Sequence, residues 1–124
     1  MISICMATYN GERFIKQQID SILKQIGPND EIVISDDHST DNTINIIENY
    51  KDPRIKIFYN DTNKKSVISN FENALKHSRG DYIFLCDQDD IWDERKISTF
   101  LLYFRSNEDI YLYLSDLYII NENG

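Results

Sequence analysis

Short apolar runs alternate along the chain with segments whose apolar residues recur at helical spacing. The runs are rich in β-branched and aromatic residues, which favour strands, and they span residues 2–6, 31–35, 55–59 and 82–86. The segments with one apolar helical face span residues 15–26, 43–50, 67–75 and 97–104. Alternation of this kind predicts a mainly parallel, Rossmann-like α/β sheet with helices on both faces.

The C-terminal part of the chain carries a different pattern. Its tyrosine-rich residues 111–120 predict one or two further strands. The chain then ends in Asn123-Gly124, a dipeptide typical of the tight turn of a hairpin, and no returning strand follows. The sequence therefore predicts a domain that is truncated inside a hairpin, and a natural C-terminus with these two residues is the alternative.

The composition is that of one globular domain. The chain has 124 residues, which suffice for a single core but not for two domains. Its 13 lysine and arginine residues against 21 aspartates and glutamates leave a net charge of −8, which opposes contact with nucleic acid. No apolar run reaches the roughly 20 residues of a membrane-spanning helix. We therefore expect a cytoplasmic domain with no membrane span in this chain.

The two cysteines, Cys5 and Cys86, both lie in apolar runs that read as buried strands. Cysteine is among the residue types most often buried in proteins. We therefore expect reduced core thiols at both positions, and neither a disulfide nor a metal-binding pair.

Polar residues follow three of the four predicted strands. In a doubly wound sheet, ligands bind beyond the carboxyl ends of the strands, where the strand order reverses. The residues at these ends are Ala7, Thr8, Tyr9 and Asn10 after the first strand, Asp36 to Asp41 after the second, and Asp87, Gln88, Asp89 and Asp90 after the fourth.

Three aspartates stand within four residues after the fourth predicted strand. Like charges about 4 Å apart repel by on the order of 4 kcal/mol at an intermediate dielectric constant, so an acidic cluster needs protons or a cation. Carboxylate oxygens suit hard ions such as Mg²⁺ or Mn²⁺. Such an ion would also let this acidic chain accept a diphosphate.

Each of these segments has a plainer interpretation. Asp90 or Asp93 is a candidate N-cap for the helix that follows, with the other acidic residues idle, and residues 39–41 are good caps for the helix at residues 43–50. Capping leaves unexplained why two consecutive aspartates, Asp36 and Asp37, close an apolar strand. Tyr9 suits either stacking on a nucleobase or simple packing.

Taken in order, the motifs resemble glycosyltransferase family 2, whose members have the GT-A fold. The resemblance rests on Ala-Thr-Tyr-Asn at residues 7–10, Ser-Asp-Asp-His-Ser-Thr-Asp at residues 35–41, and the run from Arg79 to Trp92 that contains Asp-Gln-Asp-Asp-Ile-Trp. It covers nearly the whole chain, and the form of the last motif is similar to that of the rhamnosyltransferase-type branch.

The resemblance implies roles for individual residues. The loop of Ala7, Thr8, Tyr9 and Asn10 would hold uridine or thymidine together with Asp36 and Asp37, with the Asp37 carboxylate accepting from the base. Asp87 and Asp89 would form an Asp-x-Asp motif around Gln88 that contacts the ribose and the metal. Asn70 or Lys65 would reach toward the sugar or phosphates, although a lysine in a polar loop is more often simply solvated.

The sequence departs from the family at two places. His38 stands where the family commonly has glycine, and residues 66–71 replace a segment of small residues and arginine. The family's general base lies downstream of the Asp-x-Asp motif, beyond Gly124, and Asp116 matches a recurring aspartate on the acceptor side. The expectation is therefore that residues 1–124 are the donor- and metal-binding part, without the acceptor-binding part, and bind donor without efficient transfer.

The activity implied by the resemblance is inverting transfer of a sugar from a nucleoside-diphosphate sugar to a glycan or lipid-linked acceptor, in the synthesis of surface polysaccharide. A non-catalytic nucleotide-binding module is an alternative. A phosphoacceptor signalling domain has a similar length and sheet, but its acidic pair should follow the first strand, where this chain has residues 7–10. A sugar nucleotidyltransferase would want a glycine-rich basic loop, and Gly11-Glu12-Arg13 is too slight for one.

Overall fold

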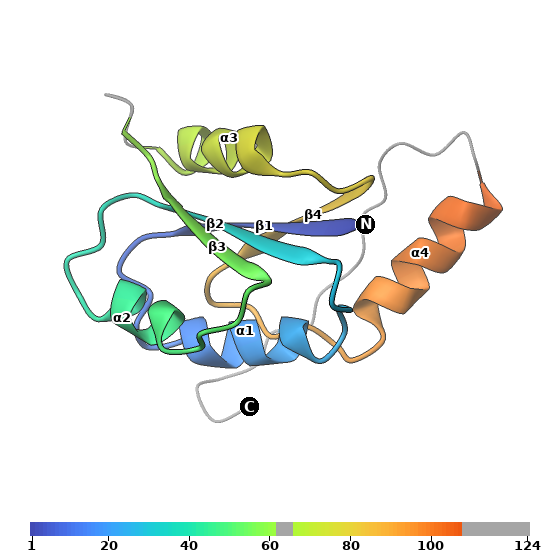
Figure 1. Ribbon diagram of the computed structural model, residues 1–124, viewed down its shortest axis with the longest axis horizontal. Coiled ribbons are helices and arrows are strands. Elements are labelled where there is room, and N and C mark those ends of the chain that lie inside the picture. Colours follow the sequence, from blue (N-terminus) through green and yellow to red (C-terminus); the bar gives the residue numbers. More distant parts are fainter. Residues whose placement is uncertain (62–65, 108–124) are drawn as a thin grey trace. The chain divides into compact units, whose positions relative to one another are not determined.

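The computed structural model describes residues 1–61 and 66–107, and it divides into two compact units, Met1–Glu94 and Arg95–Gly124 (Figure 1). The first unit alternates strands and helices: β1 (Ile2–Thr8), α1 (Ile15–Leu23), β2 (Glu31–Asp36), α2 (Thr43–Glu48), β3 (Ile55–Tyr59), α3 (Val67–His77) and β4 (Tyr82–Asp87). In the second unit the structure describes helix α4 (Lys96–Ser106). This alternation confirms the predicted α/β class, and the strands expected at residues 111–120 lie outside the described residues.

The strands form a four-stranded parallel sheet in the order β3-β2-β1-β4. In register, Thr8 of β1 lies opposite Asp36 of β2, and Ala7 lies opposite Asp87 of β4. The chain thus winds from β1 outward to β3 and then crosses back to place β4 on the other side of β1. The order reverses beside β1, so the carboxyl ends of β1 and β4 form the switch point at which such sheets bind ligands.

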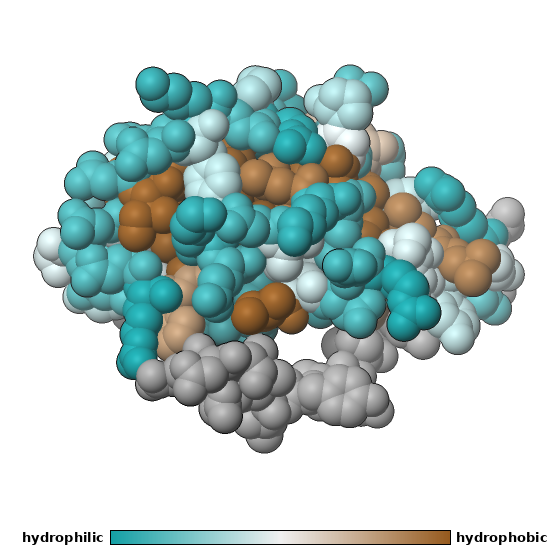
Figure 2. All heavy atoms as spheres, turned by 90° about the horizontal axis from the view of Figure 1, so that it is seen from below, coloured by the Kyte–Doolittle hydropathy of each residue, from teal (hydrophilic) through white to brown (hydrophobic). Residues whose placement is uncertain are grey.

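Helices cover the sheet on both faces, with α3 on one side and α1 and α2 on the other (Figure 1). Strands β1 and β2 are central and almost wholly buried. On the α1 side of the sheet, Ile15, Ile19 and Ile22 of α1 are fully buried, while Cys5 and Val33 pack with Ala74 of α3 on the other side. Figure 2 shows the outer surface of the α1 and α2 side, where hydrophilic residues surround smaller apolar patches.

Strand β4 is less completely covered than the central strands. Helix α3 packs on β1, β2 and β3, whereas Ile83 and Leu85 of β4 remain 46% and 57% exposed within the described part of the chain. Their neighbours Phe84 and Cys86 point to the opposite face and are buried. The expected cover on both faces therefore holds for the central strands and is one-sided at the β4 edge.

Local hydrogen bonds explain where α3 begins. Ser66 is its N-cap: the Ser66 hydroxyl accepts from the Ser69 backbone N–H at 3.1 Å, and the Ser69 hydroxyl accepts from the Ser66 N–H at 3.4 Å. This reciprocal pair satisfies two N–H groups that a helix start leaves without partners. The segment at residues 66–71 that departs from the family pattern is thus the start of a well-capped helix.

Cys5 and Cys86 are both buried, as predicted for thiols in the core. Within the described residues, none of the helices is long and apolar enough to cross a membrane.

Candidate functional site

A pocket of about 590 Å³ opens at the carboxyl ends of β1, β2 and β4, beside the N-terminus of α3. A volume of this size is ordinary for a small-molecule site. The pocket lies at the switch point of the sheet, where the strand order predicts ligand binding. The residues that line it are Ala7, Thr8, Tyr9, Asp37, Ser66, Val67, Asn70, Asp87, Gln88 and Asp89.

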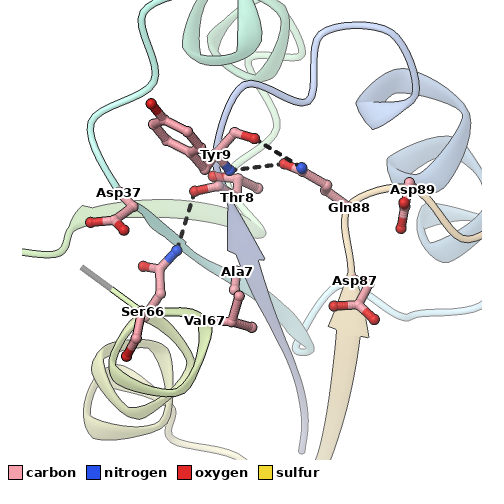
Figure 3. Close-up of a pocket in the computed structure, with 10 residues that line it drawn as sticks. Ala7, Thr8, Tyr9, Asp37, Ser66, Val67, Asp87, Gln88 and Asp89 are labelled. Carbon is pink, nitrogen blue, oxygen red and sulfur yellow. Dashed lines mark hydrogen bonds between the residues drawn. The ribbon is translucent and has the colours of Figure 1, made fainter. Parts of the chain in front are cut away.

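Three carboxylates line this pocket. Asp37 lies on one side of it, and Asp87 and Asp89 lie together on the other (Figure 3). The Asp37 Oδ1 atom is buried and has no hydrogen-bond partner among the residues that the structure describes. Leaving a buried acceptor unpaired costs on the order of 1–3 kcal/mol. An unpaired acceptor beside a pocket is therefore suited to a ligand that donates a hydrogen bond.

The pocket fits a divalent cation that is shared with a ligand better than one held by protein alone. In the described residues, no group of three or more His, Cys, Asp or Glu side chains is arranged to hold a metal. Asp87 and Asp89 nevertheless offer hard oxygen donors on one wall. Mg²⁺ is commonly held by one or two carboxylates together with substrate phosphates, so two carboxylates match that donor set.

The loops after β1 and β4 are joined by one side chain. The Gln88 Oε1 atom accepts from the Tyr9 backbone N–H at 2.9 Å, and the Gln88 Nε2 group donates to the Tyr9 carbonyl at 2.9 Å (Figure 3). Gly11 makes room for this amide, because a Cβ atom there would lie 2.3 Å from Gln88 Oε1. Gln88 thus holds the two sides of the pocket together.

Asn10 connects the β1 loop to the β2 loop instead of lining the pocket. It has a positive φ of 45°, and its Oδ1 atom accepts from the Thr40 backbone N–H at 2.8 Å. The Asn10 backbone N–H donates in turn to the Ser39 hydroxyl at 2.9 Å. Asparagine tolerates the left-handed region better than most residues. Its position in the motif therefore has a structural reason.

Asp36 and Asp37 have different surroundings although they are neighbours. Asp36 is fully buried, and its carboxylate accepts from the Thr8 hydroxyl, from the Ser39 backbone N–H and from the Ser39 hydroxyl at 2.6–2.7 Å. It does not line the pocket, whereas Asp37 does. The structure thus gives Asp36 a place behind the site, where it holds the loop that presents Asp37.

Asn70 reaches the pocket from the first turn of α3. It is buried, its Nδ2 group donates to the Thr8 carbonyl at 3.2 Å, and its Oδ1 atom accepts from the Ser35 hydroxyl at 2.6 Å. These bonds tie α3 to the ends of β1 and β2. Lys65, the other candidate at this strand exit, lies outside the described residues.

His38 lies in the loop after β2 and does not line the pocket. It has a positive φ of 58°, its Nε2 atom lies 3.0 Å from Asp61 Oδ1, and its ring stacks on Tyr59 with centroids 5.6 Å apart. The left-handed backbone explains why glycine suits this position. In this chain a histidine adopts that backbone conformation, and its side chain contacts Tyr59 and Asp61. Sequence reasoning singled out the substitution but not these partners.

The prediction that Asp90 or Asp93 caps the helix after β4 is wrong. The prediction that residues 39–41 cap the helix after β2 is correct only in part. Helix α4 has Arg95 as its N-cap, with no side-chain capping bond, so neither Asp90 nor Asp93 is its cap. The N-cap of α2 is Asn42, outside the expected residues 39–41, but Asp41 does accept from the Thr43 backbone N–H at the start of that helix, at 2.9 Å. Ser39 instead bonds Asp36.

The sequence of the chain is similar to that of known proteins. The family model described as glycosyl transferase family 2 matches residues 3–124. Among curated relatives, the UDP-Glc:alpha-D-GlcNAc-diphosphoundecaprenol beta-1,3-glucosyltransferase WfgD of Escherichia coli is 35% identical over 124 residues, which is all of this chain and 48% of that protein. The dTDP-rhamnosyl transferase RfbG of Shigella flexneri is 44% identical over 98 residues, covering 74% of this chain and 34% of that protein.

Solved structures agree in fold. Residues 1–349 of TarS from S. aureus, in complex with UDP-GlcNAc, align with a TM-score of 0.78 and 27% identity, over 86% of this chain and 32% of that one. The same region in complex with UDP aligns equally well. These matches agree with the GT-A fold expected from the motifs. The chain spans about half the length of the first curated relatives that it matches.

Proposed function

The chain belongs to glycosyl transferase family 2, and we propose that it binds a nucleoside-diphosphate sugar and a divalent cation for inverting glycosyl transfer. One observation carries the proposal: Asp37 from the end of β2, and Asp87 and Asp89 from the end of β4, line one pocket. Carboxylates gathered at a switch point suit a ligand that brings both hydrogen-bond donors and a metal-bridged diphosphate.

The unpaired Asp37 oxygen indicates which bases the pocket takes. A carboxylate only accepts hydrogen bonds, so it pairs with a base whose edge presents an N–H group. Uracil and thymine present a ring N3–H, whereas cytosine has an acceptor at N3 and donates only from its exocyclic amino group. Since Asp37 Oδ1 is buried and without a partner in the described structure, a UDP- or dTDP-linked donor relieves the cost of that unpaired atom.

Asp87 and Asp89 are the residues that would hold the diphosphate end of the donor. Without a cation, a chain with a net charge of −8 and two carboxylates on this wall repels a diphosphate. Asp87 and Asp89 would hold Mg²⁺ or Mn²⁺, and the bound ion would supply positive charge that stabilises the charge developing on the leaving group. In the reaction, the bond from the anomeric carbon to the diphosphate breaks as an acceptor hydroxyl bonds to the opposite face.

The acceptor side of the reaction stays an expectation. The general base that deprotonates the acceptor hydroxyl is expected beyond residue 124, and the acceptor is expected to be a glycan or a lipid-linked glycan at the cytoplasmic face of the membrane. WfgD, by its name, acts on a diphosphoundecaprenol-linked sugar. That relative supports the acceptor class proposed here.

Calorimetric titration tests donor binding. We expect UDP and dTDP to bind in the presence of Mn²⁺ and to lose measurable binding when EDTA removes the ion, while CMP gives no heat. Removing one metal-holding carboxylate with Asp89→Asn should weaken Mn²⁺-dependent binding by at least the roughly 10- to 100-fold that is typical when a partner of a metal ligand is removed. Absence of metal-dependent heat with UDP, dTDP and GDP alike would refute the proposal.

Asp81 provides a matched control for Asp89. It immediately precedes β4, at the opposite end of the strand, and it pairs with the N-terminal amine on the surface. Asp81→Asn removes the same formal charge without touching the pocket. It should leave the affinity for UDP unchanged, which separates a local ligand from a general effect of net charge.

A non-catalytic nucleotide-binding module remains the second candidate, because the same pocket would serve binding without transfer. The two candidates differ in turnover. A transferase releases nucleoside diphosphate from a nucleotide sugar when a suitable acceptor is supplied, and a binding module does not. Family membership favours the transferase.

A further inference from the structure

Helix α1 carries a row of polar side chains toward the segment that follows β4. Gln18 and Ser21 lie one turn apart on α1, and Gln25 lies one further turn along, just past the helix end. The Gln18 Nε2 group donates to the Asp87 carbonyl at 3.0 Å, the Trp92 backbone N–H donates to the Ser21 hydroxyl at 3.1 Å, and the Gln25 Nε2 group donates to the Asp93 carbonyl at 2.9 Å.

The three residues are also hydrogen-bonded to one another, mostly from a side chain to a backbone carbonyl of the helix. The Ser21 hydroxyl donates to the Gln18 carbonyl at 2.7 Å and approaches the Gln18 Oε1 atom at 3.3 Å. The Gln25 Nε2 group donates to the Ser21 carbonyl at 3.0 Å. Gln18 is completely buried. Glutamine is mostly found exposed, so a fully buried one with paired polar atoms is a specific arrangement rather than a solvated face.

The segment held by this row begins with the acidic wall of the pocket. Asp87 and Asp89 line the pocket, and residues 87–93 run onward from the last residue of β4. The row bonds backbone groups at both ends of this segment and leaves the Asp87 and Asp89 carboxylates for the pocket. Irregular segments need such bonds, because they lack the regular pairing of a strand.

We propose that Gln18, Ser21 and Gln25 are positioning residues that fix the Asp87–Asp93 segment so that its carboxylates face a metal-bound diphosphate. The part of this inference that concerns ligand rests on the proposed function. None of the three residues lines the pocket, so each acts through the segment it holds. Partners that orient metal-binding groups typically change metal affinity about 10- to 100-fold when they are removed.

Trp92 gives a direct readout of the segment without any ligand. It is the single tryptophan of the chain, it is 4% exposed, and its ring lies 5.9 Å from that of Phe84. Its backbone N–H is the group that Ser21 accepts from. We expect Ser21→Ala and Gln18→Leu to raise the quenching of tryptophan fluorescence by acrylamide, because a released segment exposes the indole ring.

Matched variants separate positioning from loss of stability. Ser21→Thr keeps the hydroxyl and should restore the quenching of the parent protein. Gln17→Leu changes the same residue type at the exposed neighbouring position and should have no effect. Ile22→Val, in the buried core of the same helix, lowers stability by about as much as one lost hydrogen bond and should leave quenching unchanged.

Binding of UDP with Mn²⁺, measured by calorimetry on the same proteins, tests the link to the ligand. We expect about a tenfold loss of affinity for Ser21→Ala and Gln18→Leu, and none for Ser21→Thr, Gln17→Leu or Ile22→Val. Unchanged quenching in both polar variants overturns the positioning role. Raised quenching with unchanged affinity overturns the link to ligand while donor binding stands. If the parent protein shows no Mn²⁺-dependent binding of UDP, dTDP or GDP, the proposed function fails and that link fails with it, whereas the quenching result still decides the positioning role.

Discussion

The amide of Gln88 bonds both the N–H and the carbonyl of Tyr9, at 2.9 Å each. These two bonds join the loops after β1 and β4 at the switch point of the sheet, where the strands themselves have ended. The shape of the pocket therefore depends in part on the Gln88 side chain, which hydrogen-bonds a backbone N–H and a backbone carbonyl as a neighbouring strand would. Gln88 occupies the middle position of an Asp-x-Asp motif, a position that the motif itself leaves open.

Gly11→Ala should disturb the pocket through Gln88. A Cβ atom at residue 11 would lie 2.3 Å from Gln88 Oε1, so the amide must move and lose its bonds to Tyr9. Two partly exposed hydrogen bonds contribute about 1–2 kcal/mol, so we expect UDP affinity in the presence of Mn²⁺ to fall about tenfold. Calorimetry measures this.

Gln88→Ala should reproduce most of the loss, and the double variant should lose little more, because both changes remove the same contact. Gly27→Ala is the control, since a Cβ atom there meets only Asp30 at an ordinary 3.6 Å. Additive losses in the double variant would contradict the link between Gly11 and Gln88.

Asp36→Ala and Asp37→Ala should change stability in opposite directions. Asp36 accepts three hydrogen bonds while fully buried, so its loss should lower the free energy of unfolding by on the order of 3 kcal/mol. Asp37→Ala removes a buried oxygen that has no partner in the described structure and should raise that free energy by about 1 kcal/mol. Urea unfolding without ligand measures both values.

The effect of Asp37→Ala on nucleotide binding should be opposite to its effect on stability. Asp37→Ala removes the acceptor for the base and should abolish discrimination of UDP from CDP, which differs from UDP in the base alone, although the protein is more stable. This separation of stability from binding is expected where a group is kept for its ligand. Lower stability in Asp37→Ala with unchanged nucleotide preference would exclude that role for Asp37.

Stability should depend on pH through Glu31. Burial raises the pKa of Glu31, but hydrogen bonds from Lys56, Ser3 and the Arg79 backbone N–H outweigh it, so the pKa lies below its usual value. A carboxyl whose pKa is lowered by folding stabilises the folded state above its unfolded pKa, near 4.5, and loses that contribution as pH falls through the folded value. We therefore expect the free energy of unfolding to decrease as pH drops below about 4.5.

Glu31→Gln tests this contribution against the other acidic groups. The pKa values of Asp20, Asp41 and Asp52 are also lowered and remain in the variant. The variant should be less stable at pH 7 and should approach the parent protein in acid, as followed by urea midpoints across that range. A constant difference between the two proteins at all pH values would show that Glu31 does not titrate as inferred.

Neither cysteine should react with a thiol reagent in the native protein. Burial raises the pKa of Cys5 to about 11, and the thiolate is the reactive form. Cys86 is 2% exposed. Iodoacetamide at pH 8 should therefore modify both residues only after urea unfolds the chain, as mass spectrometry would show. Rapid labelling of either residue in the folded protein would contradict its burial.

Most of the fold follows from local patterns. Strand β3 has the predicted bounds, and β1, β2 and β4 extend one or two residues beyond prediction, to Thr8, Asp36 and Asp87. The last residues of these strands, Thr8, Asp36 and Asp87, are polar, so hydrophobic periodicity does not include them. Thr8 and Asp36 are nevertheless buried, because each satisfies the other through a hydrogen bond across the two strands.

The sequence predicted which residues lie near the candidate site, but not which of them face the pocket and which hold the loops in place. Aspartates at strand ends, together with the resemblance to a known family, were enough to select Asp37, Asp87 and Asp89, and all three line the pocket. Asp36 and Asn10 were selected by the same reasoning, yet their oxygens bond the protein itself. Gln18, Ser21 and Gln25 were missed, because their spacing on a helix suggests nothing about a segment more than 60 residues away.

The sequence by itself determined the alternation of strands and helices and the placement of acidic residues at strand ends, because both depend on interactions between near neighbours along the chain. The tertiary structure alone decided which acidic oxygens are free for a ligand. That choice depends on pairing between loops that are distant in sequence, as with Gln88 and Tyr9 or Asp36 and Thr8. A hydrogen-bonding group is available to a ligand only when folding has left it without a partner.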